Sequence, residues 1–122
     1  MKVMLIDDSR TMRNIQKAAL AQLGHTEVVE AADGQEALGK VHAEAPDLIL
    51  LDWNMPIMDG LTFLKTFRQT NKKTRIILVT TEAEKSRVIE AIKAGVNNYL
   101  VKPFTTEQLQ KRIEDTLAVK AA

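Results

Sequence analysis

Polar side chains that could carry out phosphate chemistry stand directly after four apolar runs of the sequence, VMLI, LILL, IILV and YLV. They are, in chain order, Asp7, Asp8, Asp52, Thr80, Thr81 and Lys102. Three carboxylates held close together repel one another, and they stay ionised together only around a cation. Oxygen ligands without histidine or cysteine favour a hard divalent ion, so we predict Mg²⁺ rather than Zn²⁺.

The lysine and the threonine extend this chemistry from a metal to a phosphoryl group. Lys102 offers a compact positive charge for phosphoryl oxygens, and Thr80 offers a hydroxyl donor. Asp52 could then attack phosphorus and form an acyl phosphate, which is covalent catalysis of the aspartyl-phosphate type. Taken singly, each aspartate could instead be a turn former or a helix cap, and the lysine a solvated side chain. Their joint placement favours the site.

The elements that must position these residues alternate along the chain. Short apolar, β-branched runs at 3–6, around 28–29, and at 48–51, 76–79 and 99–101 predict strands that are covered on both faces. Segments with helical spacing separate them. The pattern predicts a parallel sheet with right-handed crossovers and helices on both faces. In such a sheet ligands bind outside the carboxyl ends of the strands, where the polar residues fall. Periodicity alone does not give the strand order.

Capping signals mark the predicted helices. Ser9 is a candidate N-cap of the first helix and Gly24 its stop, while Asp33 with Glu36 suits a capping box for the second. Thr105 with Gln108 suits the fifth helix in the same way. The apolar positions that mark the five helices are Met12, Ile15, Ala19 and Leu23; Ala37, Leu38 and Val41; Leu61, Leu64 and Phe67; Val88, Ile92 and Val96; and Leu109, Ile113 and Leu117.

Composition limits the classes of protein that fit. The 122 residues suit one domain, and 45% hydrophobic residues with 27% charged ones suit a packed core under a polar surface. Seventeen basic and sixteen acidic residues argue against binding nucleic acid through phosphate neutralisation. The chain has no cysteine, and its apolar N-terminal run is too short for a signal peptide or membrane span. We therefore expect a cytoplasmic monomer without a membrane or nucleic-acid partner.

Four motifs taken together resemble those of a known family. They are IDDS at 6–9, DWNMPIMDG at 52–60, VTTE at 79–82 and NYLVKPF at 98–104. With them the chain resembles the receiver domain of bacterial response regulators, and within that family the CheY-like single-domain chemotaxis regulators. The resemblance implies one receiver domain over residues 1–122, with no output domain. It also implies a flavodoxin-like (βα)5 doubly wound parallel sheet of order 2-1-3-4-5, an order of which CheY is a known example.

The resemblance assigns roles to the acidic residues. Asp52 would be the phosphoryl acceptor. Asp8 and Asp52 would ligate Mg²⁺ directly, together with the backbone carbonyl of Asn54, and Asp7 would ligate it through water. Trp53, beside the acceptor, could equally be a core residue.

The remaining roles concern the response to phosphorylation. Lys102 would bind a phosphoryl oxygen and form a cis peptide with Pro103, Thr80 would be the switch hydroxyl, and Tyr99 would change orientation. The switch and partner surface implied by the resemblance consists of Tyr99, Ala83, Lys85, Val88, Val101 and Arg112. Each of these except Tyr99 could equally belong to a solvated helix face.

Three residues beside the acceptor are expected to tune the lifetime of the phosphoryl group. Asn54 and Glu82 flank the pocket in the resemblance. Thr81 is a departure, because receivers usually carry alanine or glycine directly after the switch hydroxyl. Its larger side chain could narrow access and slow reactions with small phosphodonors or water, or it could be a surface threonine without kinetic effect.

The resulting functional prediction is a signalling switch that catalyses only its own phosphorylation and dephosphorylation. A CheA-like histidine kinase would phosphorylate it, and the flagellar motor switch protein would receive the output. The same class leaves open a single-domain phosphorelay shuttle or the isolated receiver of a transcription factor. A haloacid-dehalogenase-like phosphatase would need a second aspartate where Asn54 stands. A flavin-binding module would need a phosphate loop after the first strand, where two aspartates would repel it.

Overall fold

The computed structural model describes residues 1–118 and contains five strands with intervening helices. The last four residues of the predicted domain, 119–122, lie outside the described residues. In chain order the elements are β1 (Lys2–Ile6), α1 (Arg10–Gln22), β2 (Glu27–Ala31), α2 (Gly34–Glu44), β3 (Leu48–Asp52), α3 (Gly60–Arg68), β4 (Arg75–Thr81), the 3-10 helix η1 (Glu82–Arg87), α4 (Val88–Ala94), β5 (Asn98–Lys102) and α5 (Thr106–Ala118).

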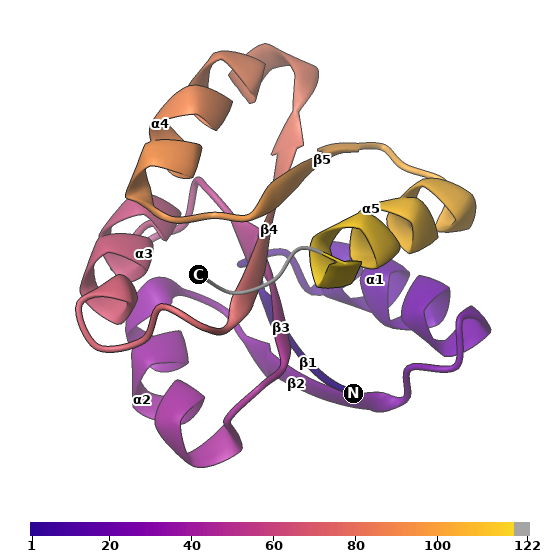
Figure 1. Cartoon of the computed structure of the whole chain (residues 1–122), viewed down its shortest axis with the longest axis horizontal. Helices are drawn as coiled ribbons and strands as arrows, with labels where there is room; N and C mark the ends of the chain where they lie inside the picture. The colour runs from indigo at the N-terminus through magenta and orange to yellow at the C-terminus, as the bar shows by residue number, and fades with distance from the viewer. Residues whose placement is uncertain (119–122) are drawn as a thin grey trace.

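The strands form one parallel sheet in the order β2-β1-β3-β4-β5. Helices α2, α3 and α4 cover one face, and α1 and α5 cover the other (Figure 1). This is the flavodoxin-like fold with the predicted strand order. Strands β1 and β3 are neighbours at the centre of the sheet, so their carboxyl ends lie side by side.

Alternate residues of the central strands pack into two separate cores, as a sheet buried on both faces requires. Met4 and Ile6 point towards the face that carries α2, α3 and α4, where they join Phe63. Val3 and Leu5 point towards α1 and α5. All four strand side chains are fully buried. The near-continuous apolar runs therefore reflect burial on both sides, as predicted.

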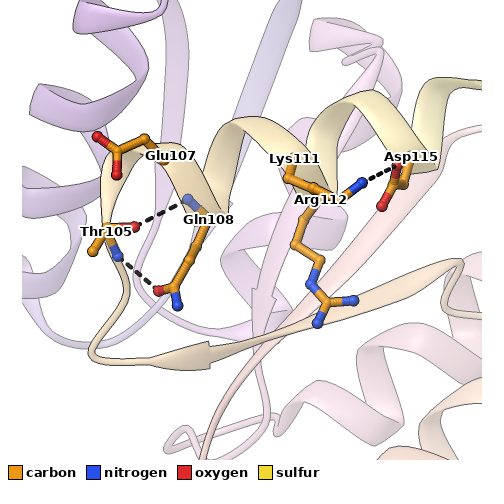
Figure 2. A pocket seen from close by; sticks show the side chains of 6 residues that line it. All are labelled: Thr105, Glu107, Gln108, Lys111, Arg112 and Asp115. Carbon is orange, nitrogen blue, oxygen red and sulfur yellow. Dashed lines mark hydrogen bonds and ion pairs between the residues drawn. The ribbon is translucent and has the colours of Figure 1, made fainter.

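Side-chain caps begin several helices where the sequence predicted them. Ser9 accepts a hydrogen bond from the Met12 amide at the start of α1, and Asp33 caps α2 by accepting one from the Glu36 amide. Figure 2 shows the reciprocal box before α5, in which the Thr105 hydroxyl oxygen accepts from the Gln108 amide at 3.1 Å. The Gln108 side chain in turn accepts from the Thr105 amide at 2.9 Å.

Three apolar residues that marked predicted helices do not join the core. Ile15, Ile92 and Leu117 are 49%, 52% and 44% exposed. In α1 the buried side chains are instead Gln16, Ala19 and Leu20. The helix is therefore rotated relative to the face that the apolar pattern indicates.

The connection between β4 and β5 also differs from the prediction of a single helix. Strand β4 continues to Thr81, and the 3-10 helix η1 precedes the short helix α4. Gly95 ends α4 with φ 118°, a left-handed conformation that glycine adopts without strain. Val96 lies beyond the helix and is buried.

Ile57, in the loop between β3 and α3, has a strained backbone and offers a test of local stability. Its φ is 66°, its side chain is 78% exposed, and the Met58 amide donates to the Pro56 carbonyl at 2.7 Å around it. A β-branched residue rarely adopts this conformation, whereas asparagine tolerates it. We expect Ile57→Asn to raise the free energy of unfolding by about 1 kcal/mol in urea titrations.

A matched substitution separates backbone strain from the removal of an exposed apolar side chain. Ile89 is 68% exposed but lies within α4, so Ile89→Asn should give no gain in stability. Equal changes in the free energy of unfolding for the two substitutions would contradict backbone strain at Ile57.

Among residues 1–118, no helix is long and apolar enough to cross a membrane.

Candidate metal and phosphoryl site

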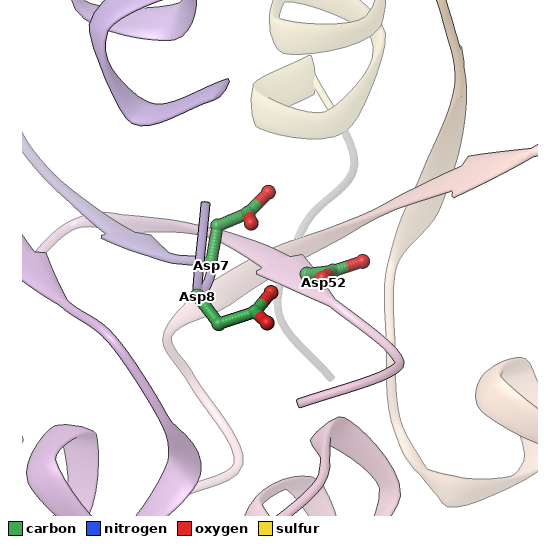
Figure 3. Close-up of side chains that lie close together, drawn as sticks. All are labelled: Asp7, Asp8 and Asp52. Carbon is green, nitrogen blue, oxygen red and sulfur yellow. The ribbon is translucent and has the colours of Figure 1, made fainter. Parts of the chain in front are cut away.

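The three predicted aspartates meet at the carboxyl ends of β1 and β3. Each of Asp7, Asp8 and Asp52 offers a carboxylate oxygen, and these oxygens lie within 4.8 Å of one another. Figure 3 shows the side chains extending from the tips of the two strands into the same space. The cluster combines residues far apart in the sequence, and its geometry could hold one metal ion.

The environment of Asp7 fits a cation. This residue is 1% exposed, and its Oδ1 accepts a hydrogen bond from the Ser9 amide at 2.9 Å. Its Oδ2 is buried and accepts no hydrogen bond from any residue within 1–118. A buried carboxylate oxygen without a donor is costly, so a hydrated divalent ion would satisfy it. The all-oxygen donor set suits Mg²⁺.

Lys102 provides the positive charge of the site. Its Nζ lies 3.4 Å from Asp52 Oδ1 and 3.7 Å from Asp7 Oδ2, and its side chain is 15% exposed. The residue is the last of β5, and the peptide bond to Pro103 is cis, as predicted. A cation at this position can interact with an anion bound at Asp52.

Burial makes the two inner carboxylates weaker acids than usual. Asp52 is 7% exposed, and burial, followed by repulsion from Asp7, raises its pKa from 3.8 to about 6 despite Lys102. Burial likewise raises the pKa of Asp7. Without a metal, the folded protein therefore disfavours the state in which Asp7 and Asp52 are both ionised.

The raised pKa of Asp52 predicts an unusual dependence of stability on pH. Because the folded state holds the proton up to about pH 6 and the unfolded state only to 3.8, stability from this group is greatest below pH 3.8 and is lost as pH rises through 6. The loss is on the order of 3 kcal/mol. Because a divalent cation interacts with the ionised carboxylate and not with the protonated one, we expect Mg²⁺ to raise the melting temperature more at about pH 8 than at about pH 5. NaCl of equal ionic strength is the control, and an equal Mg²⁺ effect at both pH values would contradict the prediction.

Thr80 lies at the same edge of the sheet, and within residues 1–118 it makes no hydrogen bond to the acids of the site. It is 1% exposed and is the next-to-last residue of β4, which pairs with β3. Its hydroxyl donates to the Thr81 carbonyl at 3.4 Å. Within residues 1–118 no hydrogen bond joins Thr80 to Asp52. The structure therefore brings the threonine to the same edge of the sheet, with its hydroxyl engaged elsewhere.

Two residues at this edge were missed by the sequence analysis. Arg13 donates from Nη1 to the Asp7 carbonyl at 2.6 Å and from Nε to Glu30 at 2.9 Å, so it supports the backbone beneath the acidic cluster. Glu84 accepts hydrogen bonds from the Asn54 side-chain amide and, at 3.2 Å, from the Thr81 hydroxyl. Arg13 follows Asp7 and Asp8 by less than two helical turns, and this spacing could have indicated a contact with them. Nothing in the sequence indicated the contacts of Glu84.

The predicted switch surface is divided between exposed and buried residues. Ala83 and Lys85 are exposed, and Tyr99, Val101 and Arg112 are partly buried; Glu82, predicted to tune the phosphoryl lifetime, is exposed as well. Val88 is only 8% exposed and belongs to the core, so its prediction as a surface residue is corrected. The cause is that Val88 begins α4 on the side that faces the sheet.

Two hollows adjoin this surface. The guanidinium carbon of Arg112 lies 4.8 Å from the centre of the Tyr99 ring, a cation–π contact beside a hollow of about 250 Å³. A second hollow of about 580 Å³ runs along α5. Figure 2 shows the residues that line it, which are Thr105, Glu107, Gln108, Lys111, Arg112 and Asp115.

Comparisons with known proteins identify the family. A family model described as the response regulator receiver domain matches residues 3–114. Chemotaxis protein CheY1 of Helicobacter pylori is 49% identical over 120 residues, covering 96% of this chain and 97% of the relative. Chemotaxis protein CheY of Pseudomonas aeruginosa is 44% identical over 116 residues, covering 93% and 94%. The structure of Vibrio cholerae chemotaxis protein CheY4 has a TM-score of 0.85 at 38% identity, covering 94% of this chain and 97% of that one. The chain therefore belongs to the response regulator receiver domain family and is a CheY-like member of it.

Proposed function

We propose that this chain is a phosphorylation-dependent switch of chemotaxis two-component signalling, formed by one receiver domain over residues 1–122. The single observation that carries the proposal is the meeting of Asp7, Asp8 and Asp52 with the ammonium group of Lys102. The names of its relatives, chemotaxis proteins that this chain matches over nearly their whole length, support the same pathway.

Asp8 and Asp52 would hold Mg²⁺ together with the backbone carbonyl of Asn54, and Asp7 would hold it through water. Once bound, the ion would neutralise charge on the transferring phosphoryl group. The unsatisfied buried oxygen of Asp7 supports this assignment. A cation would also offset the burial and the repulsion from Asp7 that raise the pKa of Asp52.

Asp52 is the nucleophile in the reaction that we propose. Its carboxylate oxygen attacks the phosphorus of a phosphohistidine on a CheA-like kinase, a P–O bond forms, and the P–N bond breaks with its electron pair returning to the imidazole. Lys102 stabilises the charge on the phosphoryl oxygens. Attack by water later releases inorganic phosphate and restores the carboxylate, so the chain processes only its own phosphoryl group.

The signal would leave the site through a change in packing. The phosphoryl group adds about two negative charges and new acceptor oxygens. Thr80 would turn its hydroxyl from the Thr81 carbonyl to this group, and Tyr99 would move into the space that is released. The position of these two residues on the adjacent strands β4 and β5 supports this proposal. The population then shifts to a state that binds the flagellar motor switch protein through the surface beside Arg112.

Trp53 supplies the direct test. It is the only tryptophan, is 3% exposed, and its amide donates to Asp52 Oδ1 at 2.9 Å. We expect its fluorescence to change on titration with Mg²⁺ and to change again when beryllofluoride is added. Transfer from a purified chemotaxis kinase should then add roughly 80 Da to the intact mass, the mass of one phosphoryl group. The absence of this added mass after incubation with the kinase and with acetyl phosphate would refute the function.

A further inference from the structure

The mouth of the acceptor site is bridged by one side chain. Glu84, in η1, accepts a hydrogen bond from the side-chain amide of Asn54 at one carboxylate oxygen. At the other oxygen it accepts from the Thr81 hydroxyl at 3.2 Å. Asn54 follows β3 by two residues, and Thr81 is the last residue of β4. Glu84 thus connects the two segments that flank Asp52.

The contact has a steric consequence for access to the site. Asn54 is exposed, whereas Thr81 and Glu84 are partly buried, and the bridge lies at the edge of the sheet where β3 and β4 end, which is also the edge that carries Asp52. While both hydrogen bonds hold, neither Asn54 nor Thr81 is free to rotate away from the opening. A phosphodonor or an attacking water must enter beside this bridge or wait until it opens.

The contact also has an electrostatic consequence. Glu84 adds a negative charge at the edge of the sheet that already carries the cluster of Asp7, Asp8 and Asp52, with Lys102 as the nearby cation. Small phosphodonors are anions, and like charges at close range repel. The carboxylate therefore opposes entry of an anion even when the bridge is open.

We propose that Glu84 is a positioning residue that closes the mouth of the acceptor site through Asn54 and Thr81, and that it slows both phosphorylation and dephosphorylation by small molecules. This inference rests on the proposed function of Asp52 as acceptor. It assigns to Glu84 a control of access, and it explains how Thr81 takes part in this control through its hydroxyl.

The test measures the rate of phosphorylation by acetyl phosphate, and of dephosphorylation after its removal, in Glu84→Ala and in the matched variant Glu90→Ala. Glu90 is exposed in the first turn of α4, and its side chain makes no hydrogen bond or ion pair within residues 1–118, so its substitution changes the net charge equally. We expect Glu84→Ala to raise both rates by about three- to tenfold, because the bridge is lost in both reactions and a charge that repels the anionic donor is removed in the first. Glu90→Ala should leave them within about twofold of the parent.

Further readouts separate control of access from a structural role. Glu84→Gln removes the charge but keeps an oxygen for the Thr81 hydroxyl, so its rates should fall between those of the parent and Glu84→Ala. The Mg²⁺ dissociation constant should stay the same in all variants. The increase in the rate of phosphorylation by acetyl phosphate should become smaller at high salt. In Thr81→Ala the further effect of Glu84→Ala should be smaller, because one hydrogen bond of the bridge is already lost.

The two proposals fail differently in this experiment. A parent protein that acquires no phosphoryl group would overturn the proposed function and this inference with it. A parent that is phosphorylated, with equal rates in Glu84→Ala and Glu90→Ala, would overturn the role of Glu84 alone. A rise in rate that accompanies an altered Mg²⁺ affinity would also overturn it, because the substitution would then act through the metal site.

Discussion

Asp52→Asn is expected to abolish formation of the phosphoprotein while it stabilises the metal-free fold. The amide has nearly the shape of the carboxylate and keeps an oxygen for the Trp53 amide, which now donates to Asp52 at 2.9 Å. It cannot attack phosphorus, so intact mass spectrometry after incubation with kinase or acetyl phosphate should show no modified protein.

The gain in stability follows from burial of the Asp52 carboxylate and from its repulsion by Asp7, which together raise the pKa of Asp52 to about 6. Near pH 8 the neutral amide removes the cost of an ionised, buried carboxylate, and we expect an increase of about 1–3 kcal/mol in the free energy of unfolding without metal. The increase should disappear at about pH 4, where the carboxyl is protonated in the parent as well. Urea titrations at both pH values measure it.

Asp8→Asn is the matched control for the loss of the nucleophile. Asp8 is exposed and belongs to the same cluster, so this variant should lose Mg²⁺ affinity yet still accept phosphoryl groups slowly on Asp52. Phosphorylation of Asp52→Asn at the parent rate would contradict the assignment of the acceptor.

Gly60→Ala is expected to disrupt the fold and the site together. A Cβ atom at Gly60 would lie 2.3 Å from the Asp52 carbonyl oxygen and 3.0 Å from the Trp53 Cα, closer than atoms can pack. The Gly60 amide also donates to the Trp53 carbonyl at 2.9 Å, which holds the start of α3 against the end of β3. Backbone must therefore move, at a cost of roughly 3 kcal/mol or more.

The displaced backbone is that of the acceptor itself, so the loss should not be confined to stability. We expect Gly60→Ala to weaken Mg²⁺ binding, followed by Trp53 fluorescence, under conditions where circular dichroism shows the protein folded. Gly39→Ala is the control, because a Cβ at that position in α2 meets no atom within 4 Å. It should stabilise the helix by about 0.5–1 kcal/mol. A Gly60→Ala protein as stable as the parent would contradict the close packing of Gly60 against the backbone of Asp52 and Trp53.

Burial on both faces made the strands and the site predictable from the sequence. Runs such as LILL have no polar face, so a polar residue that follows them is easily recognised in the sequence. A parallel sheet then places the carboxyl ends of β1 and β3 together. The strand order came from the family resemblance, because crossover length alone does not determine which strand lies beside which.

Side-chain orientation within helices was predicted less well. Gln16 is 1% exposed, whereas Ile15, the neighbouring residue, is half exposed. Apolar periodicity cannot detect a helix that buries an amide and leaves an isoleucine in solvent. The contact of Glu84 with Asn54 was likewise hidden, because it joins the 3-10 helix η1 to the loop after β3, which only the folded sheet brings together.

The short length of β5 has a consequence for the speed of the response. Lys102, which touches the acidic cluster, and Tyr99, which lies against Arg112, belong to the same five-residue strand. Three residues of extended chain span only about 10 Å. We therefore expect an electrostatic change at one end of the strand to reach the outer aromatic ring together with the rotation of Thr80 on the adjacent strand, and the two ends of β5 should relax with a single time constant.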